Sequence, residues 1–410
     1  MAPASIVIIG ASLAGATAAE ALRAAGFDGR LTLIGDEHEL PYERPPLSKG
    51  YLLGKEERAK MFVHPPGWYE DQDIDLLLGV SATGVDRGRR TVTRADGHSV
   101  AYDALLLTTG STPRRLPIPG ADLDGVLTLR KIADCERIKS LFKTASRVVF
   151  IGGGWIGLEV AAAAREAGVE ATILEVDTLP LVRVLGPEIA RVFADLHREH
   201  GVDLRTGVHV AEILGDGRRH ANGVLMQDNT RIEADAVIVA VGASPNTELA
   251  VEAGLAVDNG ILVDASLRTS DPHIYAAGDV ANATNLSLGK HLRVEHWDNA
   301  RKQPKTAARA MLGEQVVDDR IPYFFTDQYD LGMEFSGYLE PGTYDEVVVR
   351  GDLASRKFVS FWLADGRVRA GMNVNIWDVN KQVQRLVRSG RRIDPAKLGD
   401  SDTPLDELGH

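Results

Sequence analysis

The sequence contains a single cysteine, Cys135, among its 410 residues. One thiol cannot form an internal disulfide, a dithiol redox pair or a cysteine-based zinc site. Long apolar runs are also missing, because runs such as 104–107 and 148–151 are far shorter than the roughly 20 residues that span a bilayer. Together these absences exclude a disulfide-stabilised scaffold and a protein with membrane-spanning helices.

A net positive charge and a recognisable targeting signal are missing as well. The net charge of −12 disfavours nucleic acid and anionic membrane surfaces as partners. The first apolar run begins at Ile6 without a basic leader or a small-residue cleavage site, so we expect no secretory signal and a cytoplasmic location. His197 and His200 are spaced as zinc ligands could be, but no third ligand is evident. We therefore expect them on an exposed helix face and expect no metal site.

The overall composition is ordinary for a globular chain. Hydrophobic residues make up 44% and charged residues 25% of the sequence, which is enough apolar material for a large core. Because domains average roughly 150 residues, the length predicts two to three domains.

The most informative feature is a repeated pattern of strand, turn, helix and strand. In each copy a short apolar run ends in a glycine, Gly10 or Gly152, and an alanine-rich stretch then reaches another glycine 16 residues on. A second apolar run follows and ends near an acidic residue, Asp36 in the first copy and Glu175 in the second. The sequence therefore predicts two βαβ units of the dinucleotide-binding kind, 142 residues apart.

The glycine spacing follows from what a bound pyrophosphate requires. The first glycine permits a tight turn, the second position must be small so that backbone can approach the phosphates, and the third lets the helix pack on the strand. The first copy has Ser12 at the middle position, which fits if its φ angle is negative. The residues that these motifs assign are Gly10, Ser12 and Gly15 in the first copy, and Gly152, Gly154 and Gly157 in the second.

Glu175 also favours one coenzyme over the other. A carboxylate at the ribose edge accepts hydrogen bonds from ribose hydroxyls and repels a 2′-phosphate, so NADH is expected over NADPH. Arg183 lies nearby in sequence and could accept that phosphate, or could be a solvated loop arginine. Both interpretations of Arg183 stay open.

Several longer segments are distinctive. They are Pro-Tyr-Glu-Arg-Pro-Pro-Leu-Ser-Lys at 41–49, Thr-Thr-Gly at 108–110, the glycine-rich stretch 152–159, the stretch 269–279, Thr-Asp-Gln-Tyr at 326–329, and Leu-Gly-Asp at 398–400. Together they resemble the NADH-dependent, putidaredoxin reductase-like ferredoxin reductases of bacterial oxygenase systems, over essentially the whole chain. The segments 41–49 and 326–329 are specific to this family, whereas the others are shared with a wider flavoprotein superfamily.

The resemblance implies an α/β chain with the glutathione-reductase-like fold, in which two Rossmann-like dinucleotide-binding domains precede a C-terminal α+β domain. The NAD domain would interrupt the FAD domain, and turn-rich breaks at 110–113 and 242–246 support the two crossings. In the C-terminal part, β-type runs at 346–350 and 357–363 precede a helical stretch at 380–388. The implied domains are FAD-binding at 1–112 and 245–320, NAD-binding at 113–244, and C-terminal at 321–410.

The family pattern also assigns site residues. For two of them a purely structural role is the alternative, because Arg130 could form a surface ion pair and Trp297 could belong to the core. The residues implied for FAD, beyond the first motif, are Ala14, Asp36, Arg44, Pro46, Lys49, Ala82, Arg130, Asp279 and Trp297. Those implied for NAD, beyond the second motif, are Ile156, Glu159, Glu175, Arg183 and Gly242.

Lys49 and Glu159 are the pair that the resemblance places nearest to the chemistry. A lysine beside the flavin can stabilise the charge that appears on reduction, and a glutamate can neutralise that lysine beforehand and bind the nicotinamide amide. A structural buried salt bridge is a further, compatible interpretation. FAD is expected to be non-covalent, since neither histidine nor cysteine stands beside the first motif. NADH would reduce FAD, and FAD would release electrons singly to an acceptor.

The acceptor implied by the resemblance is a [2Fe-2S] ferredoxin that serves a haem-thiolate monooxygenase or a Rieske dioxygenase. Arg301 and Lys305 follow Trp297 and run against the overall negative charge, so we expect them to dock an acidic partner. The alternative is that both residues lie on a solvated helix face and bind no partner. The sequence leaves monomer and homodimer open.

Two other functions share this fold. A disulfide or peroxide reductase would need cysteine just after the first dinucleotide unit, and residues 41–49 contain none. Cys135 lies in a helical stretch, 132–142, where an inert thiol is expected. An NADH-binding signalling flavoprotein resembling apoptosis-inducing factors is the second alternative, and the missing leader and lack of long basic stretches argue against it.

Overall fold

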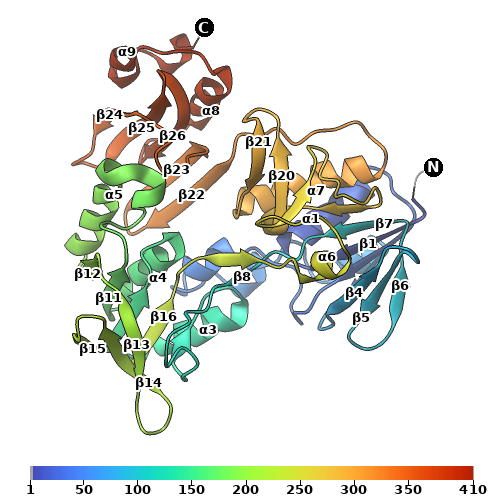
Figure 1. Ribbon diagram of the computed structural model, residues 1–410, viewed down its shortest axis with the longest axis horizontal. Helices are drawn as coiled ribbons and strands as arrows, with labels where there is room; N and C mark the ends of the chain where they lie inside the picture. Colours follow the sequence, from blue (N-terminus) through green and yellow to red (C-terminus); the bar gives the residue numbers. More distant parts are fainter. Residues whose placement is uncertain (1–2, 410) are drawn as a thin grey trace. The chain divides into compact units, whose positions relative to one another are not determined.

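The computed structural model describes residues 3–409, which fold into two compact units built from separate segments. The first unit contains residues up to 44, 57–112 and 244–322, and the second contains 45–56, 113–243 and 323 onward. Figure 1 shows the elements of both units, coloured along the chain.

The first unit is built on a five-stranded parallel sheet with the order β19-β7-β1-β2-β3. Strands β1, β7 and β19 are apolar and almost fully buried, as expected for a parallel sheet covered by helices, whereas β3 at one edge is partly exposed. The helices α1 and α7 pack against each other, and the buried alanines of α1 allow this close approach. The bounds are β1 Ser5–Ile9, β2 Arg30–Ile34, β3 Ile74–Leu77, β7 Ala104–Leu107, β19 Ile274–Ala276, α1 Leu13–Ala24 and α7 Trp297–Met311.

Two small three-stranded sheets complete the first unit. One has the order β4-β5-β6 and is antiparallel, and the other has the order β18-β20-β21. The bounds are β4 Ala82–Asp86, β5 Thr91–Arg94, β6 Ser99–Ala101, β18 Ile261–Val263, β20 Ala281–Asn285, β21 Lys290–Arg293, α2 Trp68–Asp71, α6 Glu248–Glu252, and the 3₁₀ turns η2 Arg58–Met61 and η3 Gly278–Val280.

The second unit repeats the parallel sheet with the order β12-β11-β10-β16-β9. The two copies pair their strands in the same way. Strands β10 and β11 are parallel and begin with Arg147 opposite Glu170, and β1 and β2 are parallel and begin with Ser5 opposite Arg30. The bounds are β9 Val126–Leu127, β10 Arg147–Ile151, β11 Glu170–Glu175, β12 Asp203–Thr206, β16 Ala236–Val239, α3 Ile132–Leu141, α4 Trp155–Glu166 and α5 Val182–Glu199, with the hairpin sheet β13 Val210–Gly215, β14 Ala221–Met226 and β15 Arg231–Glu233 and the 3₁₀ turn η1 Pro45–Ser48.

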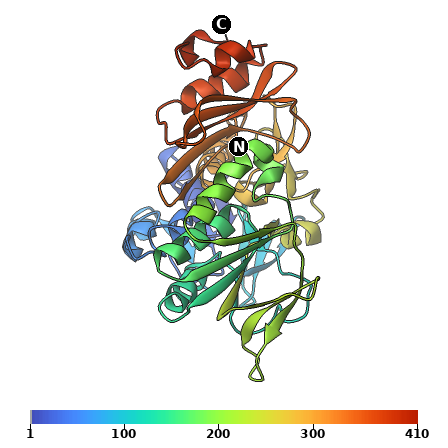
Figure 2. The same cartoon turned by 90° about the vertical axis from the view of Figure 1, so that its left-hand side faces the viewer.

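The C-terminal part of the second unit is an antiparallel sheet with the order β22-β23-β26-β25-β24. Helices α8 and α9 lie on one face of it, while α5 lies on the other (Figures 1 and 2). The Trp362 indole of this sheet donates a hydrogen bond to the Leu185 carbonyl of α5. The bounds are β22 Tyr323–Gln328, β23 Leu331–Gly337, β24 Glu346–Asp352, β25 Lys357–Ala364, β26 Arg367–Val374, α8 Asn380–Ser389, α9 Pro395–Gly399 and the 3₁₀ turn η4 Leu405–Glu407.

The predicted fold class, two Rossmann-like domains followed by an α+β domain, is confirmed. Both dinucleotide units, the β-type runs near 346 and 357, and the helix from 380 are present. Among residues 3–409, no helix is both long and apolar enough to cross a membrane.

Candidate functional site

The first glycine-rich turn joins β1 to α1 in the first unit. Gly10 has a φ of +116°, and a Cβ atom there would lie 2.2 Å from the Thr108 carbonyl oxygen. A Cβ at Gly15 would lie 2.1 Å from the Gly10 carbonyl oxygen. Ser12 has a φ of −123°, the negative value that the sequence interpretation required of it. The serine therefore leaves the turn geometry intact.

The N-terminus of α1 suits a bound phosphate. No side chain among the described residues caps it, because Ser12 makes no capping hydrogen bond, and its first turn carries no acidic residue. The unsatisfied N–H groups and the positive end of the helix dipole are therefore available to an anion. These observations fit the pyrophosphate of FAD.

The remaining first-unit residues assigned to FAD lie at strand and helix ends. Asp36 is exposed after β2, and Ala82 is the first residue of β4. Asp279 lies in η3, where its Oδ2 accepts a hydrogen bond of 3.1 Å from the Ser111 hydroxyl. Trp297 begins α7, and the Arg301 guanidinium stacks 4.7 Å from the centre of its ring.

Glu37 is a residue of this region that the sequence reasoning missed. It accepts a hydrogen bond of 2.7 Å from the Tyr42 hydroxyl and pairs with Arg44 at 3.3 Å. Arg44 also lies 5.3 Å from the centre of the Tyr42 ring. The dinucleotide-binding motif calls for an acidic residue at the end of its second strand. Glu37 lies there beside Asp36, and this position could have identified it.

The second glycine-rich turn has the same geometry in the second unit. Gly152 has a φ of +106°, and a Cβ there would lie 2.4 Å from the Ala240 carbonyl oxygen. A Cβ at Gly157 would lie 2.3 Å from the Gly152 carbonyl oxygen. Gly154 differs, because its φ is −79° and the nearest atom to a Cβ is 3.9 Å away. The protein atoms around the middle position therefore leave room for a side chain there.

Glu175, at the end of β11, holds this turn together. Its Oε2 accepts from the Gly153 N–H at 2.5 Å and its Oε1 accepts from the Asp177 N–H at 2.8 Å. Arg183 forms an ion pair with Asp177 at 2.6 Å and is largely exposed. Because a carboxylate oxygen accepts more than one hydrogen bond, Glu175 retains capacity for ribose hydroxyls.

Two further residues assigned to NAD are accessible around this turn. The large apolar side chain of Ile156 is 46% exposed on the first turn of α4. Gly242 is exposed after β16, with a φ of +94°. Their exposure is consistent with contact to a ligand.

Lys49 and Glu159 form a close ion pair in the second unit. Lys49 Nζ lies 2.6 Å from Glu159 Oε1, and the two side chains are 18% and 7% exposed. Two hydroxyls also donate to the carboxylate, Ser48 to Oε2 at 2.5 Å and Thr326 to Oε1 at 2.6 Å. Lys49 Nζ additionally lies 5.4 Å from the centre of the Phe325 ring.

The sequence reasoning identified Lys49 and Glu159 but missed their hydroxyl partners. Ser48 adjoins Lys49 in the quoted loop, and Thr326 begins the quoted Thr-Asp-Gln-Tyr segment. Thr326 is far from both in sequence, so no local pattern indicated that it would meet Glu159. The other FAD residues assigned to this unit are Pro46, in η1, and Arg130, whose backbone N–H donates to Asp134.

The prediction of an exposed helix face for His197 and His200 is wrong. His197 is 0% exposed and its Nε2 lies 2.9 Å from Gln328 Oε1, while His200 stacks on the Tyr329 ring at 3.7 Å. Burial lowers the pKa of His197 to about 4, despite the hydrogen bond with Gln328. This face of α5 is covered by residues of the C-terminal domain, which no local helix pattern reveals.

Cys135 is buried in α3, and its burial raises the pKa of the thiol to about 12. A protonated, inaccessible thiol is neither a nucleophile nor a redox partner. Among residues 3–409, no group of three or more His, Cys, Asp or Glu side chains is arranged to hold a metal ion.

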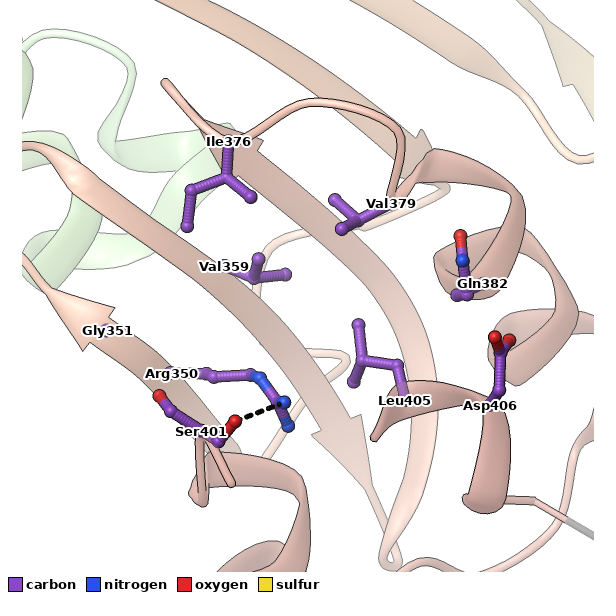
Figure 3. A pocket seen from close by; sticks show the side chains of 9 residues that line it. All are labelled: Arg350, Gly351, Val359, Ile376, Val379, Gln382, Ser401, Leu405 and Asp406. Atoms are coloured by element: carbon purple, nitrogen blue, oxygen red, sulfur yellow. Dashed lines mark hydrogen bonds between the residues drawn. The ribbon is translucent and has the colours of Figure 1, made fainter. Parts of the chain in front are cut away.

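A cavity of about 360 Å³ lies in the C-terminal domain (Figure 3). Its apolar lining includes Val359, Val379 and Leu405, and Arg350 at its edge donates to the Ser401 carbonyl. None of the site residues predicted from the sequence lines this cavity.

Comparisons with known proteins cover nearly the whole chain. The family model of pyridine nucleotide-disulphide oxidoreductases matches residues 4–304, and a reductase C-terminal model matches residues 323–409. Putidaredoxin reductase of Pseudomonas putida is 38% identical, covering 98% of this chain and 96% of the relative. The 5,5′-dehydrodivanillate O-demethylase ferredoxin reductase subunit of Sphingobium is 40% identical, covering 98% and 97%. The crystal structure of the covalent putidaredoxin reductase–putidaredoxin complex matches with a TM-score of 0.95 at 38% identity, covering 99% of this chain and 98% of that chain.

Two nucleotide-binding turns, one on the parallel sheet of each unit, and the matching family model define a flavoprotein oxidoreductase that uses FAD and NAD(H). Within that class, the chain belongs to the family of ferredoxin reductases that includes putidaredoxin reductase. The resemblance seen in the sequence is thereby confirmed.

Proposed function

We propose that this protein passes electrons from NADH, through non-covalently bound FAD, to a [2Fe-2S] ferredoxin that serves an oxygenase. The observation that carries the proposal is the Lys49–Glu159 pair, because Glu159 lies on α4, the helix that begins at the second nucleotide turn. Relatives that match over nearly their full length support the acceptor, since their names describe ferredoxin reductases of a demethylase and of dioxygenase systems.

FAD would be held in the first unit by Gly10, Ser12, Ala14 and Gly15 at its pyrophosphate and by Asp279 near its ribityl chain. Asp36 and Arg44 would contact the AMP half. Ala82 and Trp297 would contribute further contacts, as would Pro46, Lys49 and Arg130. When bound, FAD supplies the conversion of a two-electron hydride into single electrons. The protein supplies binding, orientation and charge, and no protein nucleophile or metal is needed.

Lys49 and Glu159 have complementary electrostatic roles in this proposal. A lysine cation beside the flavin lowers the free energy of the negative charge that reduction creates. Before reduction that cation is balanced by Glu159 at 2.6 Å, so the ammonium is held in place without an uncompensated charge. Glu159 is also expected to accept a hydrogen bond from the nicotinamide amide.

Gly152, Gly154, Ile156, Gly157 and Gly242 would bind NADH in the second unit. The Glu175 carboxylate, bound to the turn through the Gly153 N–H, would accept ribose hydroxyls and repel a 2′-phosphate. Arg183 is already paired with Asp177, which supports the solvated-loop interpretation of it. NADH is therefore expected to be the better substrate.

The coenzyme preference predicts a specific mutational result. NADH should have a higher kcat/KM than NADPH. Glu175→Ala should reduce the ratio of the two kcat/KM values by about tenfold, because the variant loses a charged hydrogen bond to the ribose of NADH and no longer repels the 2′-phosphate of NADPH. Steady-state kinetics with both coenzymes measure this. Equal efficiency of the two coenzymes in the unaltered enzyme would contradict the proposal.

Arg301 and Lys305 are proposed to dock the ferredoxin. They lie one helical turn apart on α7, both are exposed, and no ion pair to Lys305 is found within residues 3–409.

We also propose a cytoplasmic location, in line with the buried, unpaired thiol of Cys135.

Stopped-flow mixing with NADH, followed by cytochrome c reduction with and without a [2Fe-2S] ferredoxin, tests the function. We expect rapid flavin bleaching and ferredoxin-dependent cytochrome c reduction. Flavin reduction without electron delivery to any ferredoxin of a panel would favour the signalling flavoprotein alternative instead.

A further inference from the structure

Thr326 and Gln328 lie two residues apart on β22, and each is 1% exposed. Residues at such spacing point to the same face of a strand, and β22 packs against α4. Polar side chains are rarely buried unless they are hydrogen-bonded, because an unpaired polar group costs free energy. Both residues must therefore find partners inside the second unit.

Their partners form one continuous series of hydrogen bonds that ends at Glu159. Thr326 Oγ1 lies 2.6 Å from Glu159 Oε1, and Gln328 Nε2 lies 3.2 Å from Thr326 Oγ1. Gln328 Oε1 lies 2.9 Å from His197 Nε2. His197 Nδ1 in turn lies 3.5 Å from the Tyr329 hydroxyl. The series thus connects α5, β22 and α4.

Every hydrogen bond in this series is donated to the next residue in the direction of Glu159. A carboxylate can only accept, so Thr326 uses its one hydroxyl hydrogen on Glu159 and must accept from Gln328. The Gln328 oxygen then faces the imidazole and accepts from His197 Nε2–H. His197 Nδ1 is left without a hydrogen and accepts from Tyr329. Each residue therefore fixes the hydrogen position of the next.

The buried ring of His197 suits this direction. Burial lowers its pKa to about 4, so the imidazole is neutral near pH 7 and has one hydrogen to donate. A neutral ring with its hydrogen on Nε2 is the tautomer that the series requires.

We propose that Thr326 is a positioning residue for Glu159, and that Gln328 and His197 orient the Thr326 hydroxyl toward the carboxylate. The inference rests on the proposed function, because Glu159 acts there through Lys49 and the nicotinamide. Ser48 and Lys49 both belong to the loop after Arg44, whereas Thr326 approaches from β22. With donors on both oxygens, the carboxylate cannot rotate without losing a hydrogen bond, so the Lys49 ammonium is held where the charge develops.

Three variants of the FAD-loaded enzyme test this inference. Thr326→Val keeps the side-chain shape but removes the donor, and Thr326→Ser restores a hydroxyl. We expect Thr326→Val to slow flavin reduction by saturating NADH about tenfold, with Thr326→Ser within about twofold of the unaltered enzyme. Ser360→Ala is the matched control, since this buried hydroxyl of the same sheet has no hydrogen-bond partner in the described chain. It should leave the rate unchanged.

A double-mutant comparison separates positioning from a general packing effect. In a Glu159→Gln background, Thr326→Val should add less than about twofold, because the carboxylate that Thr326 orients is gone. An equal slowing in both backgrounds, or a Thr326→Ser enzyme as slow as Thr326→Val, would overturn the inference.

A second readout does not involve activity. With ¹⁵N-labelled histidine, NMR of the holoenzyme should show His197 as a neutral Nε2–H tautomer from pH 6 to 8, and Gln328→Leu should abolish that preference. The signal is assigned with His197→Asn. An Nδ1–H tautomer or titration in this range would refute the direction of the series. Failure of the proposed function is distinguishable, since the unaltered enzyme would then not be reduced by NADH or would not reduce ferredoxin, while the NMR result would stand.

Discussion

Position 154 can hold a side chain that position 152 cannot. A Cβ at Gly152 would meet the Ala240 carbonyl at 2.4 Å with a φ of +106°, whereas Gly154 has a negative φ and open space. We expect Gly152→Ala to lower the melting temperature by several degrees or prevent folding. Gly154→Ala should keep the melting temperature and raise the KM for NADH several-fold, because the methyl group stands where the pyrophosphate approaches. Equal melting losses in both variants would show that the middle glycine is structural.

Lys49 allows binding and chemistry to be separated at a single residue. Because negative charge appears on the flavin only during reduction, Lys49→Met should slow single-turnover reduction by NADH about 10- to 100-fold while FAD is retained. Stopped-flow absorbance and the flavin-to-protein ratio measure the two effects. If the variant loses FAD but is reduced normally after reconstitution, Lys49 is a binding residue only.

At the scale of elements, α5 and β22 determine a pH dependence of stability. His197 has a folded-state pKa of about 4 and an ordinary pKa near 6.5 when unfolded. Between these values the unfolded state binds the proton and the folded state does not, so stability is lost as pH falls from 6.5 toward 4. We expect a loss of about 2 kcal/mol between pH 7 and pH 5 from this residue.

Urea unfolding at the two pH values measures this loss, and His197→Gln provides the comparison because it cannot titrate. The variant should lose correspondingly less stability on acidification than the unaltered protein. The same pH dependence in both proteins would mean that other groups are responsible.

The elements near the glycine motifs could be predicted from sequence, whereas contacts between distant elements could not. Strand β1, helix α1 and their second copies follow from local spacing, because the turn chemistry dictates glycine at fixed positions. The burial of His197 and the approach of Thr326 to Glu159 depend on how β22 packs on α4 and α5. No periodicity within α5 distinguishes a face covered by a later domain from a face in solvent.

At the scale of the whole molecule, a net charge of −12 coexists with a basic row on α7. Arg301, Lys305 and Arg309 recur every four residues, so they share one side of the helix. Lys305→Glu should raise the KM for an acidic ferredoxin about five- to tenfold at low salt and leave the KM for NADH unchanged.

Lys143→Glu is the matched control, because it changes the net charge equally at an exposed position just after α3. Ferredoxin-dependent cytochrome c reduction over a series of salt concentrations measures both variants. A ferredoxin KM that is independent of salt, or equal effects of the two substitutions, would place docking elsewhere.

Cys135 has a practical consequence for experiments on this protein. The only thiol of the sequence is buried inside α3, with its pKa raised to about 12. Maleimides and disulfide reagents attack exposed thiolates, so the native chain offers them almost no target near pH 7. A cysteine engineered at a chosen surface position would be the one thiol that such reagents modify. Spin labels, fluorophores or cross-linkers can therefore be attached site-specifically without first removing the native residue.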